Sequence, residues 1–173
     1  MKAIEFWKVV TVDESRLLEQ LVEALRERSI RYCVVGGQAV NAYVEPLVSL
    51  DLDLAVTVDD LPAVEAMAAE RFRLERFPHS LNVSLPGSDL RAQVQTDPRY
   101  AAFVDGASPR NVLGVLLPVA RVEDVLQGKV WAAEDPSRRP SKRQKDLADI
   151  ARLLEAYPEL RGRVPDALLK RLV

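Results

Sequence analysis

Cysteine and histidine are scarce in this sequence. Its 173 residues include one of each, Cys33 and His79. A single cysteine excludes an internal disulfide, and one cysteine with one histidine excludes the usual kind of zinc site. Any metal ion is therefore expected to be a hard cation held by carboxylates. Cys33 lies in an apolar run and is expected to be buried, and His79 is expected to be structural.

Long hydrophobic runs and a strong net charge are also missing. No apolar run approaches the roughly 18 residues of a transmembrane helix, and residues 1–12 lack the apolar core and cleavage site of a signal peptide. The formal net charge of -2 argues against a protein whose whole surface binds nucleic acid or membrane. With 48% hydrophobic and 29% charged residues, the chain has the composition of one globular domain. We expect a cytoplasmic protein without a membrane partner.

The order of predicted elements indicates a mixed α/β (α+β) fold, with a small mixed sheet flanked by helices. Apolar residues at helical spacing predict helices at 13–28, 38–43, 60–71, 122–134 and 141–156, the first capped by Asp13 or Ser15. Short apolar or alternating runs predict strands at 30–35, 49–58, 72–77, 81–85 and 90–96, and a strand or buried loop at 112–120. We expect a core of residues 1–120 and a C-terminal helical segment of residues 121–173 packed on it.

Two glycines and two aspartates carry the chemistry. Gly36 and Gly37 follow the first predicted strand and open a helix, where a bare backbone and free N–H groups, with Gln38 beside them, suit a phosphate. Asp51 and Asp53 are two apart on the next strand and therefore share a face. Two carboxylates so close repel each other, and a divalent cation relieves that repulsion. The alternative is a turn followed by two solvated edge-strand residues.

The run from Tyr32 to Val56 resembles the nucleotidyltransferase superfamily that includes polymerase β and the minimal nucleotidyltransferases. The shared signature is an apolar residue and Gly-Gly, followed after a gap by Asp-x-Asp; here thirteen residues separate Gly37 from Asp51. The resemblance implies that the two glycines contact a triphosphate and that Asp51 and Asp53 coordinate Mg²⁺.

A later segment is similar to the AbiEii-type, toxin-related branch of that superfamily. It comprises Lys129 with Ala132, then Arg138-Arg139, then Lys145-Asp146-x-x-Asp149. The resemblance implies that Lys129 and Lys145 face the nucleotide or the acceptor, and Arg139 is a further candidate for binding the nucleotide.

One departure from the superfamily concerns its third carboxylate, which a neighbouring strand usually supplies. The strand at that place presents Gln93, and an amide cannot act as a general base. Asp89, just before that strand, is the alternative.

The basic stretch at 138–145 has two interpretations. It is either a solvated helix face, with Lys142–Asp146 and Lys145–Asp149 as pairs one turn apart, or a surface that neutralises triphosphate or an RNA backbone. Trp7 and Trp131 are expected to be packing residues.

Three functional hypotheses follow. The first is Mg²⁺-dependent transfer of a nucleoside monophosphate from a nucleoside triphosphate to a hydroxyl of a tRNA end, a protein or a small molecule such as an antibiotic. The second is a fold that has lost catalysis and binds a nucleotide or a partner. The third is one half of a toxin–antitoxin pair, with an antitoxin partner.

Overall fold

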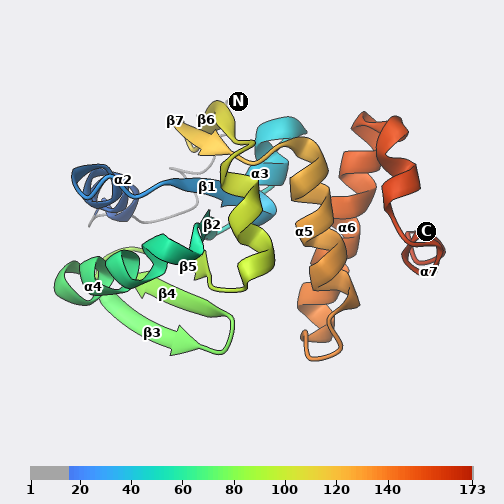
Figure 1. Ribbon diagram of the computed structural model, residues 1–173. Coiled ribbons are helices and arrows are strands. Elements are labelled where there is room, and N and C mark those ends of the chain that lie inside the picture. The colour runs from blue at the N-terminus through green and yellow to red at the C-terminus, as the bar shows by residue number, and fades with distance from the viewer. Residues whose placement is uncertain (1–15, 173) are drawn as a thin grey trace.

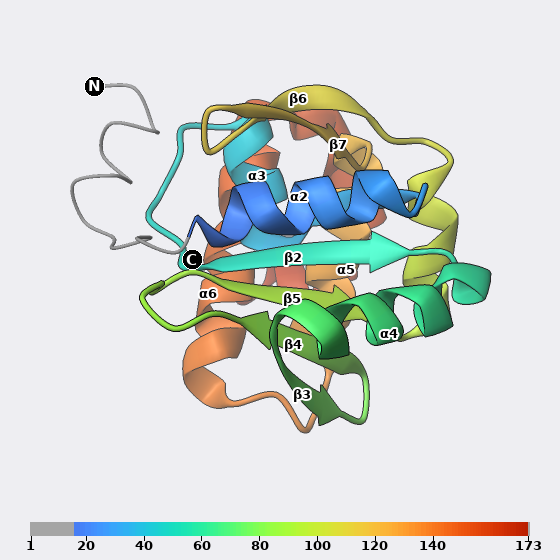
Figure 2. The ribbon, with the colours of Figure 1, turned by 90° about the vertical axis from the view of Figure 1, so that its left-hand side faces the viewer.

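A seven-stranded mixed sheet forms the centre of the molecule. The computed structural model describes residues 16–172, and its strands follow the order β3-β4-β5-β2-β1-β7-β6. Helices α2 and α4 cover one face of the sheet, and α3, α5 and α6 cover the other (Figures 1 and 2). This three-layer arrangement confirms the predicted mixed α/β fold.

The strands are short, and they pair in both senses. They are β1 (Tyr32–Val35), β2 (Asp51–Val56), β3 (Arg73–Phe77), β4 (Ser80–Ser84), β5 (Arg91–Gln95), β6 (Ser108–Val112) and β7 (Val115–Val119). β2 is antiparallel to β1 and parallel to β5, and β1 is parallel to β7. The three chain-neighbour pairs β3–β4, β4–β5 and β6–β7 are antiparallel.

The helices form the outer layers. They are α2 (Leu17–Glu27), α3 (Gly36–Tyr43), α4 (Leu61–Arg71), α5 (Val122–Glu134), α6 (Pro140–Ala156) and α7 (Asp166–Leu169), with 3-10 helices η1 (Val58–Asp60), η2 (Pro98–Val104) and η3 (Pro158–Arg163). Within residues 16–172, no helix is long and apolar enough to cross a membrane.

The core lies between the sheet and both helical layers, because each element offers it an apolar face. α2 buries Leu17, Leu21 and Leu25 at helical spacing, and β1 buries Cys33 and Val34 completely. Cys33 is therefore buried as predicted, and its burial, with a smaller contribution from Asp124, raises the pKa of its thiol to about 12.

Most predicted elements are found near their expected places. α5 has the predicted bounds, and α6 begins one residue early at Pro140, a residue suited to a first helical turn. The predicted start of the first helix, its caps Asp13 and Ser15, and Trp7 lie outside the described residues. The division into residues 1–120 and 121–173 stays a prediction.

Strand β6 was not predicted. Its sequence, Ser108 to Val112, contains a proline and buries only its last residue, so it lacks the apolar alternation of a half-buried strand. Leu113 and Gly114 both have positive φ and close a tight hairpin to β7. The second predicted strand, 49–58, is shorter in the structure, because β2 begins at Asp51, and Leu50 just before it is 36% exposed.

Candidate functional site

Asp51 and Asp53 lie on one face of β2, in the middle of the sheet. Leu52 and Leu54 are buried on the opposite face, as strand alternation requires. In the register between β1 and β2, Asp53 stands opposite Val35, the residue before α3. The fold thus sets this carboxylate against the N-terminus of α3.

Gly36 makes this close approach possible. It is the first residue of α3 and has a φ of 68°, in the left-handed region that favours glycine. A Cβ atom at Gly36 would lie 2.9 Å from the Cβ of Asp53 and closer still to its Oδ2. At Gly37 the nearest atom to a new Cβ, Ser49 Oγ, would be 3.6 Å away, which is an ordinary contact. Of the two predicted glycines, Gly36 is therefore the one that the Asp53 position requires.

Asp53 is half-buried, but its Oδ1 is fully buried and incompletely satisfied. Its Oδ1 has no hydrogen-bond partner among the described residues. Burial raises the pKa of Asp53 to about 6, against the attraction of Lys129 and with added repulsion from Asp51. A cation bound to the free oxygen would offset this cost.

Asp51, in contrast, is paired on both of its oxygens. Arg91 Nη2 lies 3.1 Å from Oδ1, and Lys142 Nζ lies 3.4 Å from Oδ2. Arg91 comes from β5, directly opposite Asp51 in the strand register, and Lys142 comes from α6.

Gln93 occupies the position next to Asp53 on β5. Its amide nitrogen donates a hydrogen bond to Ser80 Oγ at 3.0 Å. Two cavities adjoin the site, a larger one of about 510 Å³ and a smaller one of about 120 Å³. Asp89 is exposed and lines neither of them. Within residues 16–172, no group of three or more His, Cys, Asp or Glu side chains is placed to hold a metal ion.

The residues present nevertheless fit Mg²⁺. This ion usually takes one or two protein carboxylates and completes its octahedron with water and substrate phosphates. Asp51 and Asp53 supply two carboxylates on one face, and the free Oδ1 of Asp53 offers an unused oxygen.

Lys129 joins α5 to α6 in the interior. Its Nζ lies 3.1 Å from Asp146 Oδ1 and 2.8 Å from Asp149 Oδ2. Burial alone would lower the pKa of Lys129, but the two carboxylates more than offset this and hold it above its ordinary value. The side chain lines both cavities, yet its charge is already balanced within the protein. Its role towards a nucleotide stays a prediction.

The predicted pairs Lys142–Asp146 and Lys145–Asp149 are not formed among the described residues. In the described structure, Asp146 pairs with Lys129 and with Arg138, whose Nη2 is 3.2 Å from Oδ1. Asp149 pairs with Lys129 and with Arg152 at 2.7 Å. Asp146 therefore pairs with residues outside α6, whereas Asp149 pairs with Lys129 of α5 and with Arg152 one turn along α6.

The other predicted nucleotide-binding residues lie in different surroundings. Gln38 is buried, and its amide donates to the Ser49 carbonyl oxygen at 2.8 Å, so it holds the segment before β2. Arg139 is exposed just before α6 and lines neither cavity. Lys145 is exposed on α6 and lines the smaller cavity.

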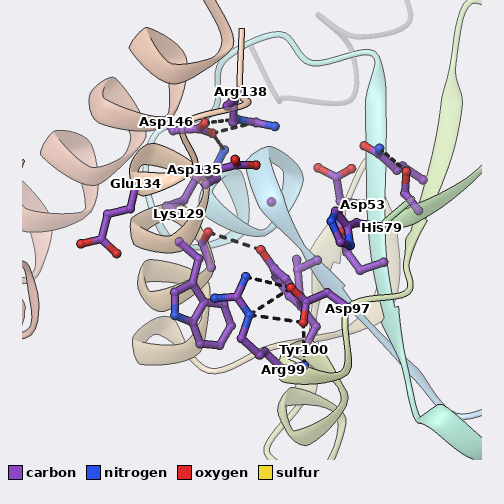
Figure 3. Close-up of a pocket in the computed structure, with 18 of the residues that line it drawn as sticks. Asp53, His79, Asp97, Arg99, Tyr100, Lys129, Glu134, Asp135, Arg138 and Asp146 are labelled. Atoms are coloured by element: carbon purple, nitrogen blue, oxygen red, sulfur yellow. Dashed lines mark hydrogen bonds and ion pairs between the residues drawn. The ribbon is translucent and has the colours of Figure 1, made fainter. Parts of the chain in front are cut away.

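The larger cavity has a volume of about 510 Å³. It lies between the ends of β4 and β5, η2 and α5 (Figure 3). In Figure 3, Asp53 and His79 lie on one side, Lys129 on the other, and Asp97 with Arg99 below them. His79, expected to be structural, is exposed in the β3–β4 turn and lines this cavity.

Aromatic side chains form one wall of the larger cavity. Trp131 stacks on Phe103 with ring centroids 5.6 Å apart and meets Tyr100 edge-on at 5.3 Å. The Arg99 guanidinium lies 4.5 Å from the Trp131 ring centroid and also pairs with Asp97 at 2.8 Å. Trp131 is a packing residue, as expected, but it and Tyr100 also face the cavity.

The smaller cavity, of about 120 Å³, lies on the α6 side of the two aspartates. Its wall includes Gly37, Ser49 and the basic residues Lys142, Lys145 and Arg152. Asp53, Lys129, Arg138 and Asp146 line both cavities.

Comparison with known proteins finds similar folds among solved structures. No protein-family model and no curated protein sequence matches the chain. The antibiotic-resistance factor ANT(2'')-Ia matches 90% of this chain with 90% of its own, at 18% identity and a TM-score of 0.58. The lincosamide antibiotic adenylyltransferase LnuA matches 83% of this chain with 99% of its own, at 13% identity and a TM-score of 0.55. An antigenic nucleotidyltransferase-like protein from Paracoccidioides brasiliensis matches 93% with 95% of its own, at 19% identity and a TM-score of 0.50.

The chain has a nucleotidyltransferase fold. Identities this low establish the fold and not the activity or the substrates. Within that fold, the sequence did not single out Arg91 as a partner of Asp51. It also gave no sign that Lys142 reaches Asp51, because this approach depends on how α6 packs.

Proposed function

We propose that this chain transfers a nucleoside monophosphate from a nucleoside triphosphate to a hydroxyl group. The observation that carries the proposal is the position of Asp53, which lies against the N-terminus of α3 and lines two cavities of unlike charge, with Asp51 on the same strand in the wall of the smaller cavity. The N-terminus of a helix attracts phosphate, and carboxylates on one strand face attract a divalent cation.

The smaller cavity suits the triphosphate. Lys142, Lys145 and Arg152 supply positive charge there, and Gly37 leaves the backbone open. Asp51 and Asp53 would hold Mg²⁺, which neutralises phosphate charge and helps to activate the α-phosphate. The acceptor oxygen would then attack the α-phosphate in line as the bond to pyrophosphate breaks. Its proton would pass to solvent, since the Gln93 amide cannot accept it, and pyrophosphate would leave on the side of the basic residues.

The larger cavity suits a small acceptor better than an RNA backbone. Apart from the residues that the two cavities share, its described wall includes the carboxylates of Asp97, Asp124, Glu134 and Asp135 but only one arginine, Arg99. Carboxylates repel phosphates and favour neutral or cationic groups. A volume of about 510 Å³ lies within the range of small-molecule sites. ANT(2'')-Ia has been solved with adenylyl-2''-tobramycin and LnuA with lincomycin, so we propose a small hydroxylated molecule, with tobramycin as the first cationic probe.

Label transfer tests the proposal. The protein is incubated with Mg²⁺, each α-labelled nucleoside triphosphate, and either tobramycin, lincomycin, bulk tRNA or cell extract. We expect labelled small-molecule product from the unmodified protein and none from the Asp51→Ala/Asp53→Ala variant. Asp89→Ala is the matched control, because Asp89 is a nearby carboxylate that lines neither cavity. Transfer that persists in the double variant would contradict the proposed site, and label on tRNA alone would contradict the proposed acceptor.

Gln93 favours a second candidate, a nucleotide-binding module without catalysis. An amide beside Asp53 cannot accept the proton of the attacking hydroxyl. This candidate predicts that the unmodified protein binds triphosphate without transferring it, and that Gln93→Glu introduces transfer. Calorimetry and label transfer on the two proteins separate the candidates.

The kinship with the AbiEii-type branch and an antitoxin partner remain proposals of narrower scope. They rest on the segment from Lys129 to Asp149, whose carboxylates pair with Lys129 in the structure. Growth arrest on expression, relieved by the product of an adjacent gene, would support them; normal growth would contradict them.

A further inference from the structure

Asp51 holds two cations of its own where a metal ion would bind. Arg91 contacts Oδ1 at 3.1 Å and Lys142 contacts Oδ2 at 3.4 Å. Each oxygen of the carboxylate therefore has a different positively charged neighbour. A Mg²⁺ ion bound to Asp51, at about 2.1 Å, would compete with both.

The two pairs are open enough to exchange. The side chains of Asp51, Arg91 and Lys142 are 30%, 58% and 40% exposed. Ion pairs with this much access to water are weak and reversible. They balance the charge of Asp51 but leave its carboxylate able to exchange partners.

Lys142 and Arg91 differ in what else they can reach. Lys142 lines the smaller cavity together with Lys145, whereas Arg91 lines neither cavity. If a triphosphate occupies the smaller cavity, Lys142 finds a new anionic partner there without leaving its place on α6. Arg91 would simply return to solvent.

We propose that Lys142 is an exchangeable counter-ion, which pairs with Asp51 before substrate binds and transfers to the triphosphate when the metal–nucleotide complex arrives. This inference rests on the proposed function. It makes Lys142 a positioning residue that opposes binding of free metal and favours binding of metal with nucleotide. Metal and triphosphate therefore bind together, because the triphosphate draws Lys142 away from Asp51 and the metal takes the place of Lys142 at Asp51.

Two binding measurements on three variants test the exchange. Binding of Mn²⁺ alone is followed by electron paramagnetic resonance, and binding of MgATP, MgGTP, MgCTP and MgUTP by calorimetry. For Lys142→Gln we expect Mn²⁺ to bind about three- to tenfold more tightly and the preferred Mg-nucleotide to bind more weakly by a similar factor. Arg91→Gln should strengthen Mn²⁺ binding without weakening nucleotide binding.

Lys145→Gln is the matched control. It removes the same charge from the same helix and cavity, but Lys145 forms no ion pair with Asp51 among the described contacts. It should weaken nucleotide binding and leave Mn²⁺ binding unchanged. Thermal unfolding of each variant checks that the fold is intact.

The outcomes separate this inference from the proposed function. If the unmodified protein binds Mn²⁺ and a Mg-nucleotide but Lys142→Gln weakens both or behaves as Lys145→Gln does, the exchange is wrong and the proposed function stands. If the unmodified protein binds neither ligand, both are overturned. The exchange is supported if Lys142→Gln, and neither of the other two variants, both strengthens Mn²⁺ binding and weakens nucleotide binding.

Discussion

The two cavities that meet at Asp53 differ most in charge. The smaller one adds Lys142, Lys145 and Arg152 to the shared wall, against Asp51 and Asp149. Among the described residues, the larger one adds Arg99 as its only arginine beyond the shared wall, against four carboxylates: Asp97 just before η2, Asp124 and Glu134 of α5, and Asp135 just after α5. One cavity therefore favours an anion, and the other favours a neutral or cationic molecule.

This difference arises from a small number of secondary structure elements. α6 supplies the basic residues Lys142, Lys145 and Arg152 of the smaller cavity. α5 supplies the carboxylates of Asp124 and Glu134 to the larger one. Lys129 and Asp146 connect the two helices and belong to both walls. The same buried pair thus separates a basic region from an acidic one, so a substrate with a triphosphate and an acceptor without one can be sorted by charge alone.

The largest expected effect comes from breaking the shared wall. Lys129→Met leaves Asp146 and Asp149 without their buried lysine, and removing one partner of a buried ion pair costs about 3–5 kcal/mol. We expect urea unfolding to show a loss of that size and both cavities to lose their ligands. Lys145→Met, at an exposed position of α6, is the control and should change stability by less than about 0.5 kcal/mol. Equal stability of the two variants would show that the pair does not hold the wall.

The next largest effect is expected at Gly36, beside Asp53, whose side chain lines both cavities. Gly36→Ala places a Cβ against Asp53 at a residue with positive φ. Overpacking and left-handed backbone strain together cost roughly 2–4 kcal/mol. Metal binding should also fall, because Asp53 must move. Gly37→Ala meets only ordinary contacts and should retain both stability and metal binding; thermal unfolding and Mn²⁺ titration compare the two.

How far the sequence predicts this site depends on whether each contact is local. Gly36 and Asp53 were found because strand alternation and a strand-to-helix turn are local patterns. The partners of Asp51 were not, because Arg91 is set by the parallel pairing of β2 with β5 and Lys142 by the packing of α6. The fold was predicted better than the site for the same reason.

The helix α6 shows most clearly that tertiary contacts are not predicted from sequence spacing. Spacing along the helix predicted Lys142–Asp146, yet Asp146 points inward to Lys129 and Arg138. A buried lysine is stabilised more by a neighbouring carboxylate than an exposed lysine is, because water screens the exposed ion pair. Tertiary pairing therefore replaced the local pair, and no local pattern reveals this.

A pH-dependent effect follows from Asp53. Burial raises its pKa from 3.8 to about 6, so the folded protein binds this proton more tightly than the unfolded chain does. The destabilisation by the charged form is therefore fully present above pH 6 and disappears as the pH falls towards 3.8. Asp53→Asn should raise the free energy of unfolding at pH 8 by up to about 3 kcal/mol, at 1.36 kcal/mol per pH unit. The gain should shrink towards pH 4 in urea titrations without metal; a gain that grows on acidification would contradict the raised pKa.

The smallest expected effect tests the charge difference itself. Asp135 lines the larger cavity, and hydrogen bonds from Ser137 lower the pKa of its carboxyl, so it stays charged at neutral pH. Asp135→Asn should weaken binding of the cationic probe tobramycin about threefold, or under 1 kcal/mol, while nucleotide affinity stays the same. Lys145→Gln should do the reverse, because Lys145 lines the smaller cavity. Calorimetry on both variants with both ligands gives four affinities. If either variant changes both ligands equally, the two cavities do not sort their ligands by charge, and the shared wall alone governs binding.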